Sequence, residues 1–160
     1  MRQPLAAACL AAFTAVVVAA AAAAAAPVSG TFSIDGTAYA IGDVSAQALP
    51  SSGPDDPAWQ LVFSEQPHEH TAAGRERALD GDHGVAFVVE VLPSGEGHLF
   101  VLYQREPGAT SAYPSSFPWP AVSGFAADGS SVRGKLANNP DFPYQQIRFE
   151  LTFAAPVLGR

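Results

Sequence analysis

Short runs of alternating apolar and polar residues, separated by Gly, Pro and Asp, fill most of the chain after residue 26. The clearest run is Gln145–Ala154, where Ile147, Phe149, Leu151 and Phe153 alternate with polar residues. Successive side chains of a β-strand point to opposite faces, so this alternation predicts a strand with one buried face. A chain built mainly from such runs is expected to form an all-β domain.

The residues between the runs predict how the strands are joined. Asp35-Gly36 and Asp128-Gly129 are pairs typical of tight hairpins, because glycine accepts a positive φ. Only 71–80 has helical character, and Gly74 in its middle limits the helix to one or two turns. About eight strands without crossover helices predict antiparallel pairing in a β-sandwich or a small β-barrel. The predicted strands are Val28–Ile34, Thr37–Ile41, Asp43–Leu49, Ala58–Ser64, Gly84–Leu92, Gly97–Arg105, Ala121–Ala126, Ser131–Ala137 and Gln145–Ala154.

Two of these segments, Gly84–Leu92 and Gly97–Arg105, are apolar at nearly every position. That pattern is typical of central strands that are covered on both faces. Pro107–Pro120, by contrast, is rich in Pro and Ser and is predicted to be a long loop.

The first 26 residues have the layout of a secretory signal peptide. Arg2 gives a positive start, and the 22 residues from 5 to 26 carry no charge and end in a run of alanines. Cleavage is expected within 20–26, which leaves a single β domain over 27–160 in the periplasm or outside the cell. An uncleaved anchor is the alternative, although alanine is only weakly lipophilic. Cys9 lies too early in the apolar stretch for a lipoprotein.

Charge and cysteine content argue against several classes of partner and chemistry. The chain has 15 acidic and 8 basic residues, a net charge of −7, which loss of Arg2 would make −8. An acidic chain is poorly suited to bind nucleic acid or anionic membrane surfaces. Without Cys9 the mature chain has no disulfide, thiolate nucleophile or Cys-ligated metal. Seven Arg against one Lys, together with the many alanines, indicates a GC-rich bacterial genome.

One histidine-rich segment resembles a metal site. His68 and His70 are two residues apart, so on an extended chain their rings point the same way, and Asp82 and His83 follow in the same connection. Imidazole and carboxylate ligands suit zinc or copper. A solvated loop that gathers polar residues is the alternative. The HExxH pattern of zinc proteases does not occur.

Proline-stiffened loops with aromatic residues are the second candidate site. Tyr113, Phe117 and Trp119 lie in one loop, and Phe142 and Tyr144 in another. Prolines fix such loops, so the rings can meet a ligand at low entropic cost. A small molecule, a glycan or a protein could bind there. Alternatively, these rings close the open end of the core.

Sequence signals for catalysis are few. The chain has no G-x-S-x-G elbow, and Asp80-Gly81-Asp82 lacks the spacing of a calcium-binding EF-hand. Glu90 could act as an acid if it faces inward, because burial raises the pKa of a carboxyl group. A structural charge, or a partner for Arg105, is the simpler interpretation.

The segments VSGTFSIDGTAYAIGDVSAQ at the start and VSGFAADGSSVRGKL…IRFELTFAAPV at the end resemble small secreted bacterial β proteins that have no assigned role. This resemblance implies a secreted β fold and carries no catalytic residues. The sequence therefore predicts an exported, non-catalytic binding or accessory module without a required cofactor. The alternative is a periplasmic protein that binds zinc or copper through the histidine-rich segment.

Overall fold

The computed structural model describes residues 27–141 and 146–159, which form ten strands and one helix. The predicted all-β architecture is confirmed, and one strand, β7, lies outside the nine expected segments. The elements are β1 (Val28–Ile34), β2 (Thr37–Ala38), β3 (Asp43–Ala48), β4 (Trp59–Ser64), α1 (Ala72–Leu79), β5 (Ala86–Val91), β6 (Gly97–Gln104), β7 (Tyr113–Pro118), β8 (Ala121–Ala127), β9 (Ser131–Ala137) and β10 (Ile147–Pro156).

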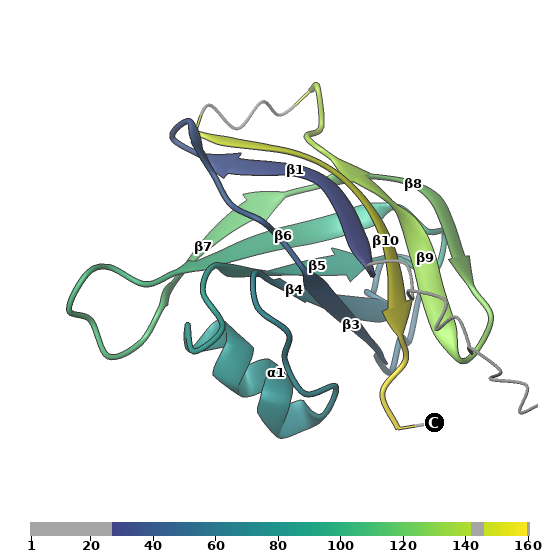
Figure 1. Ribbon diagram of the computed structural model, residues 1–160. Helices are drawn as coiled ribbons and strands as arrows, with labels where there is room; N and C mark the ends of the chain where they lie inside the picture. The colour runs from purple at the N-terminus through teal and green to yellow at the C-terminus, as the bar shows by residue number, and fades with distance from the viewer. Residues whose placement is uncertain (1–26, 142–145, 160) are drawn as a thin grey trace, which may run out of the picture.

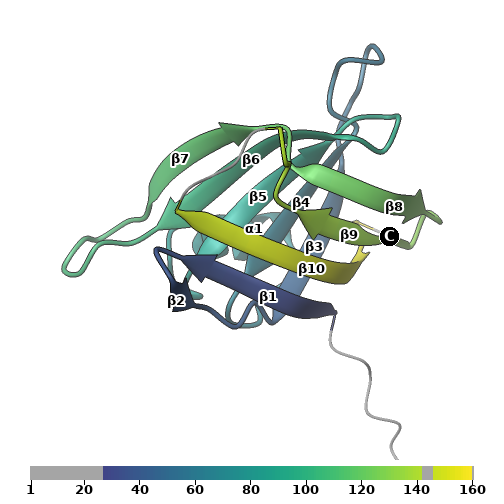
Figure 2. The ribbon, with the colours of Figure 1, turned by 90° about the horizontal axis from the view of Figure 1, so that it is seen from above.

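The strands form two five-stranded sheets that pack face to face (Figures 1 and 2). Sheet A has the order β2-β1-β10-β9-β8 and sheet B the order β3-β4-β5-β6-β7. All strand pairs within the sheets are antiparallel. In the described residues one isolated bridge, between Ala46 of β3 and Val157 just after the end of β10, links the two sheets. The fold is thus sandwich-like, and the sheets do not close into a barrel.

Stacked phenylalanines join the two sheets. Phe87 on β5 lies 4.9 Å from Phe32 of sheet A and 4.6 Å from Phe63 of sheet B, measured between ring centroids. Phe100 and Phe149 stack across the sheets at 5.1 Å. The predicted inward face of the last strand is confirmed, since Ile147, Phe149, Leu151 and Phe153 are all buried.

Helix α1 covers the outer face of sheet B, on the side away from sheet A (Figure 1). Ala78 of the helix packs with Val62 and Val88, which form a small second core with it. The expectation of two covered faces is therefore confirmed for β5, whereas Val101 and Tyr103 on the outer face of β6 are only half-buried. Thr71 caps the helix by accepting a hydrogen bond from the Gly74 N–H at 3.0 Å. No helix among the described residues is long and apolar enough to cross a membrane.

Two details differ from the expected strands. The segment 113–118 was expected in a loop but forms β7, paired with β6 through Phe117 opposite Phe100. Because β7 is an edge strand, the missing N–H groups of Pro114 and Pro118 cost it little. The second expected strand, 37–41, is only two residues long in the structure. The turn before it is as expected, with a positive φ at both Asp35 and Gly36.

Candidate functional site

A buried polar cluster lies on the outer face of sheet B, beside helix α1. Asp43 and Ser45 are two residues apart on β3, so their side chains share one face of the strand. Ser64 on β4 lies opposite Asp43 in the register. Asp43 is only 5% exposed, and both serines are fully buried. The loop between β4 and α1 covers these residues and carries His68 and His70.

His68 is held at both ring nitrogens. Its Nδ1 lies 2.8 Å from Ser64 Oγ, and its Nε2 lies 2.8 Å from Ser45 Oγ. Ser64 Oγ donates its own proton to the Gln66 carbonyl at 2.7 Å, so it accepts from His68 Nδ1–H. His68 Nε2 then accepts from Ser45 Oγ–H. The partners thereby assign the Nδ1–H tautomer to the neutral ring.

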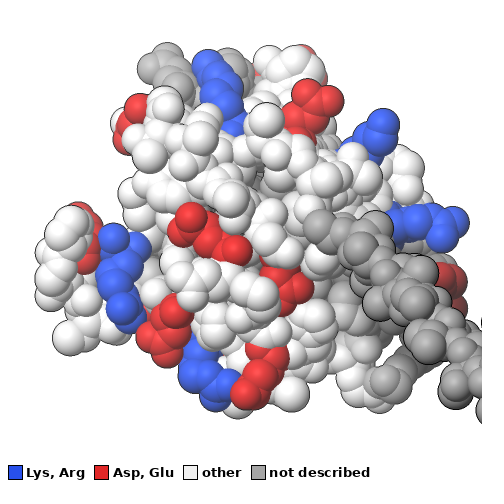
Figure 3. Space-filling model, viewed as in Figure 1, with Lys and Arg blue, Asp and Glu red and all other residues white. Residues whose placement is uncertain are grey.

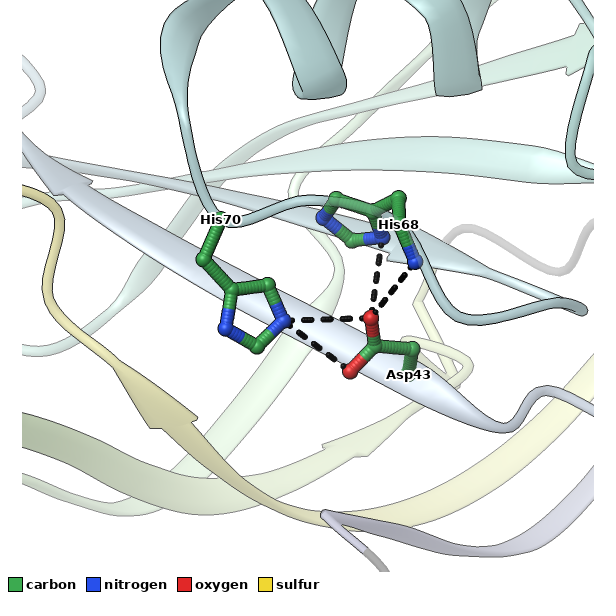
Figure 4. A group of neighbouring side chains, drawn as sticks. All are labelled: Asp43, His68 and His70. Atoms are coloured by element: carbon green, nitrogen blue, oxygen red, sulfur yellow. Dashed lines mark hydrogen bonds and ion pairs between the residues drawn. The ribbon is translucent and has the colours of Figure 1, made fainter.

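The Asp43 carboxylate lies between the two imidazoles (Figure 4). Its Oδ2 accepts the His68 backbone N–H at 2.9 Å and lies 3.2 Å from His68 Nδ1. His70 Nε2 lies 3.1 Å from Oδ2 and 3.2 Å from Oδ1. The His68 side chain is fully buried, whereas that of His70 is 35% exposed. The cluster therefore reaches solvent through His70.

Arg75 supports the cluster from the helix. Its Nη1 donates to the Ser45 carbonyl at 3.2 Å and lies 3.4 Å from Ser45 Oγ. Its Nη2 donates to Gln60 Oε1 at 2.7 Å and to the Gln60 carbonyl at 3.3 Å. No acidic partner of this guanidinium is seen among the described residues, and burial lowers its pKa to about 10. It remains protonated at neutral pH and fixes β3, β4 and α1 together.

Burial lowers the pKa of His68 to about 4, because the charged imidazolium would lose its hydration. Asp43 acts in the opposite direction, while His70, His83 and Arg75 add to the lowering. At neutral pH His68 is thus an uncharged ring with a lone pair, the form in which histidine binds a metal.

Two kinds of chemistry use these residue types. Ser45, His68 and Asp43 lie in the order of an acyl-transfer triad, but Ser45 has no exposed surface and no substrate carbonyl can reach its hydroxyl. A metal ion needs only the ligand atoms to converge. One atom each from Asp43, His68 and His70 lie within 4.8 Å of one another. The arrangement therefore suits a metal better than a nucleophile.

The histidine-rich segment was expected to use four residues, and the structure brings two of them together. His68 and His70 share Asp43, which sequence reasoning missed. Asp82 instead lies 3.5 Å from Arg105 Nη2, a surface ion pair. The His83 ring is 6.3 Å from that of His68, near the cluster but outside it. Asp43 is distant in sequence, and only its place at the start of a strand opposite Ser64 brings it to the histidines.

The aromatic candidates that the structure describes, Tyr113, Phe117 and Trp119, do not form one surface. Tyr113 is 61% and Trp119 50% exposed, but Phe117 is half-buried and packs near Phe100 of the core. Six residues of extended chain place Tyr113 and Trp119 about 20 Å apart. Phe142 and Tyr144 lie outside the described residues.

Glu90 lies on the outer face of sheet B with Val88, away from the core between the sheets. The Glu90 side chain is half-buried beside a bulge. Burial raises the pKa of Tyr103, and the negative charge of Glu90 adds to that rise. No hydrogen bond or ion pair joins Glu90 to a histidine in the described part of the chain. In the view of Figure 3, acidic and basic side chains are interspersed, without a broad area of either sign.

Comparisons with protein-family models, with curated proteins and with solved structures give no match.

Proposed function

We propose that this chain is an exported protein that binds one divalent transition-metal ion, zinc or copper, through Asp43, His68 and His70. The observation that carries the proposal is the spacing of the ligand atoms. The Asp43 oxygens lie 3.1–3.2 Å from the nearest imidazole nitrogens. Zinc bonds of about 2.0–2.1 Å in a tetrahedron place neighbouring ligand atoms about 3.3 Å apart. The three ligand atoms all lie within 4.8 Å of one another, so the two histidines would move closer together around the ion.

The surroundings of His68 also suit a metal ligand. When Nδ1 binds the ion, the ring proton moves to Nε2, which can then donate to Ser45 Oγ at the same 2.8 Å. Arg75 fixes Ser45 from the helix. A hydrogen bond of this kind on the second nitrogen orients the ring and sets its tautomer. Ser64 would give up one hydrogen bond and keep the one that it donates to Gln66.

Three protein ligands leave a fourth position for water or another small ligand. The partly exposed ring of His70 marks the side of the cluster from which an ion can enter. We therefore propose capture and exchange of the ion, rather than a closed structural site, as the role of the cluster.

Titration of metal-free protein with zinc and with copper tests the proposal. We expect one ion per chain with a Kd of about 1 μM or tighter, weakened at least about tenfold in His70→Ala. His98→Ala is the matched control, because His98 lies on β6 outside the cluster. Wild-type affinity in His70→Ala, or no binding at about 1 mM ion, would contradict the proposal.

A second candidate function, a binding module that uses the aromatic loops, is favoured by one observation. Trp119 has a φ of 45°, a left-handed conformation that is strained for a bulky residue, and half of it is exposed. It lines a hollow of about 240 Å³ with Glu96 and Asn139. Aromatic rings beside polar side chains can bind a sugar ring.

Fluorescence of Trp59→Phe, in which Trp119 is the one remaining tryptophan, tests this function. We expect a spectral shift with at least one member of a glycan and lipid panel. An unchanged spectrum across the panel would exclude Trp119 as part of a binding surface for these ligands.

A further inference from the structure

The outer face of sheet A carries a hollow of about 660 Å³, on a different sheet from the metal cluster. Its floor is made of short side chains and glycine from four neighbouring strands, with Pro27 at one end. Arg133 and Lys135, both on β9, line the hollow with long, positively charged side chains. The hollow thus combines a floor of small residues with two cations.

Strand register places the polar groups in one row across the sheet. Thr152 of β10 pairs with Ser29 of β1 on one side and with Lys135 of β9 on the other. Lys135 pairs in turn with Ser123 of β8. The row therefore presents three hydroxyls and one ammonium group to solvent. Arg133 lies in the next row, opposite Ala154.

A bulge shapes one side of the hollow. The register of β8 shifts between Ser123 and Ala126, and Gly124 within this segment has a φ of 59°. Bulges bend the strand that contains them and increase its twist. Phe125, the next residue, packs inward near Trp59, with 6.3 Å between the rings. The outer side at this point is left to Gly124, which has no side chain.

The two cations have no partner in the described part of the chain. Arg133 and Lys135 make no hydrogen bond or ion pair there, whereas Arg77 pairs with Glu69, and Arg105 with Asp82. On the same face the nearest acid along β10 is Glu150, two residues before Thr152, and it does not line the hollow. The chain has a net charge of −7, yet two cations without partners lie beside this cavity. That arrangement favours the binding of an anion.

From these features we infer a second binding site, for an acidic sugar that carries carboxylate or phosphate groups together with hydroxyls. Side chains two residues apart on a strand are separated by about 7 Å, so Arg133 and Lys135 can each bind one acidic group. The hydroxyls of Ser29, Ser123 and Thr152 can bond sugar hydroxyls. The ligand is either a free sugar acid or sugar phosphate, or a segment of an acidic polysaccharide.

Calorimetric titration of metal-free exported protein tests the site. Mass spectrometry of the same protein identifies its N-terminal residue, because Pro27 lines the hollow. The ligands are trigalacturonate, glucose 1-phosphate, the neutral maltotriose and inorganic phosphate. We expect trigalacturonate or glucose 1-phosphate to bind with a Kd below about 1 mM, and the ligand that binds identifies the source. Arg133→Gln/Lys135→Gln should weaken that binding at least about tenfold.

Two controls separate the site from net charge. Arg77→Gln/Arg105→Gln makes the same change in charge elsewhere and should change the affinity less than about twofold. Ala154→Leu fills the hollow at constant charge and should weaken binding. Equal losses in both double variants, equal binding of maltotriose or of phosphate alone, or no binding at about 10 mM would overturn the inference. Because no metal is present, failure here is distinct from failure of the metal proposal.

Discussion

His68 is the residue that organises the polar cluster, because its two ring nitrogens and its backbone N–H are all hydrogen-bonded. No buried polar side-chain atom in the described residues lacks a partner. Burying such a network costs little free energy only when every donor and acceptor in it is hydrogen-bonded. The neutral ring satisfies this condition, and a second ring proton would have to displace the one that Ser45 donates.

The pKa of His68 makes stability depend on pH. The folded value of about 4 lies below the usual 6.5, so the unfolded chain binds a proton first as the pH falls. Stability from this group is complete above about pH 6.5 and is lost down to about pH 4, by at most about 3 kcal/mol. Urea unfolding of the metal-free protein between pH 7 and 4 checks this. His68→Gln should flatten the slope over that range, and an unchanged slope would contradict the assignment.

The loop before α1 leaves no room for a side chain at Gly74. Glycine weakens a helix, so Gly74→Ala would ordinarily stabilise α1. Here a Cβ atom would lie 2.1 Å from the Glu69 carbonyl oxygen. We expect Gly74→Ala to lower the free energy of unfolding by about 1–3 kcal/mol, measured by denaturant titration. A gain in stability would show that the loop before α1 can move aside.

At the scale of the element, α1 is attached to sheet B by a small apolar contact and one buried cation. Ala78 is the fully buried apolar residue of the helix, while Arg75 bonds to both β3 and β4. A helix of eight residues has little stability of its own. The position of the loop that carries His68 and His70 therefore depends on Arg75.

Arg75→Met should cost about 2–4 kcal/mol of unfolding free energy, because it leaves the Ser45 and Gln60 acceptors unpaired. Arg77→Met on the exposed face is the matched comparison. It loses only a surface ion pair with Glu69, for about 0–1 kcal/mol. Thermal and denaturant unfolding of both variants measure the difference. Equal effects would contradict the anchoring role.

Most elements could be predicted because each carries its own signal. The alternation of 147–153 and the Asp35-Gly36 turn are local patterns, and both appear in the structure. Strand β7 was missed because its prolines resemble a loop, and only pairing with β6 makes it a strand. Asp43 was missed for a similar reason. Strand pairing brings it to His68, 25 residues away, and no local pattern encodes that pairing.

At the scale of the whole molecule, the two sheets are joined by the phenylalanine stack, and each sheet carries a polar feature on its outer face. Phe87 stacks on rings of both sheets and is fully buried. The Asp43–His68–His70 cluster and the hollow of sheet A lie on opposite outer faces, so neither needs the other for its geometry. The core is the structural element that both share.

Phe87→Ala should therefore destabilise the whole domain, by about 3–5 kcal/mol, through the cavity that it leaves. Tyr113→Ala removes an aromatic ring that is 61% exposed and should cost less than about 0.5 kcal/mol. Unfolding followed by fluorescence and by circular dichroism gives both values. Separate transitions for the two probes in Phe87→Ala would show that the sheets do not unfold together.

The central claim is that Asp43, His68 and His70 bind a metal ion, and the metal content of the protein itself tests it most directly. Untagged protein is produced from the full sequence, purified without chelator and analysed for its elements, together with Asp43→Asn. The account predicts close to one zinc or copper per wild-type chain and a small fraction of that in Asp43→Asn, since the amide removes the anionic ligand between the histidines. Wild-type protein without bound metal that also takes up neither ion on addition, or full metal content in Asp43→Asn, would contradict it.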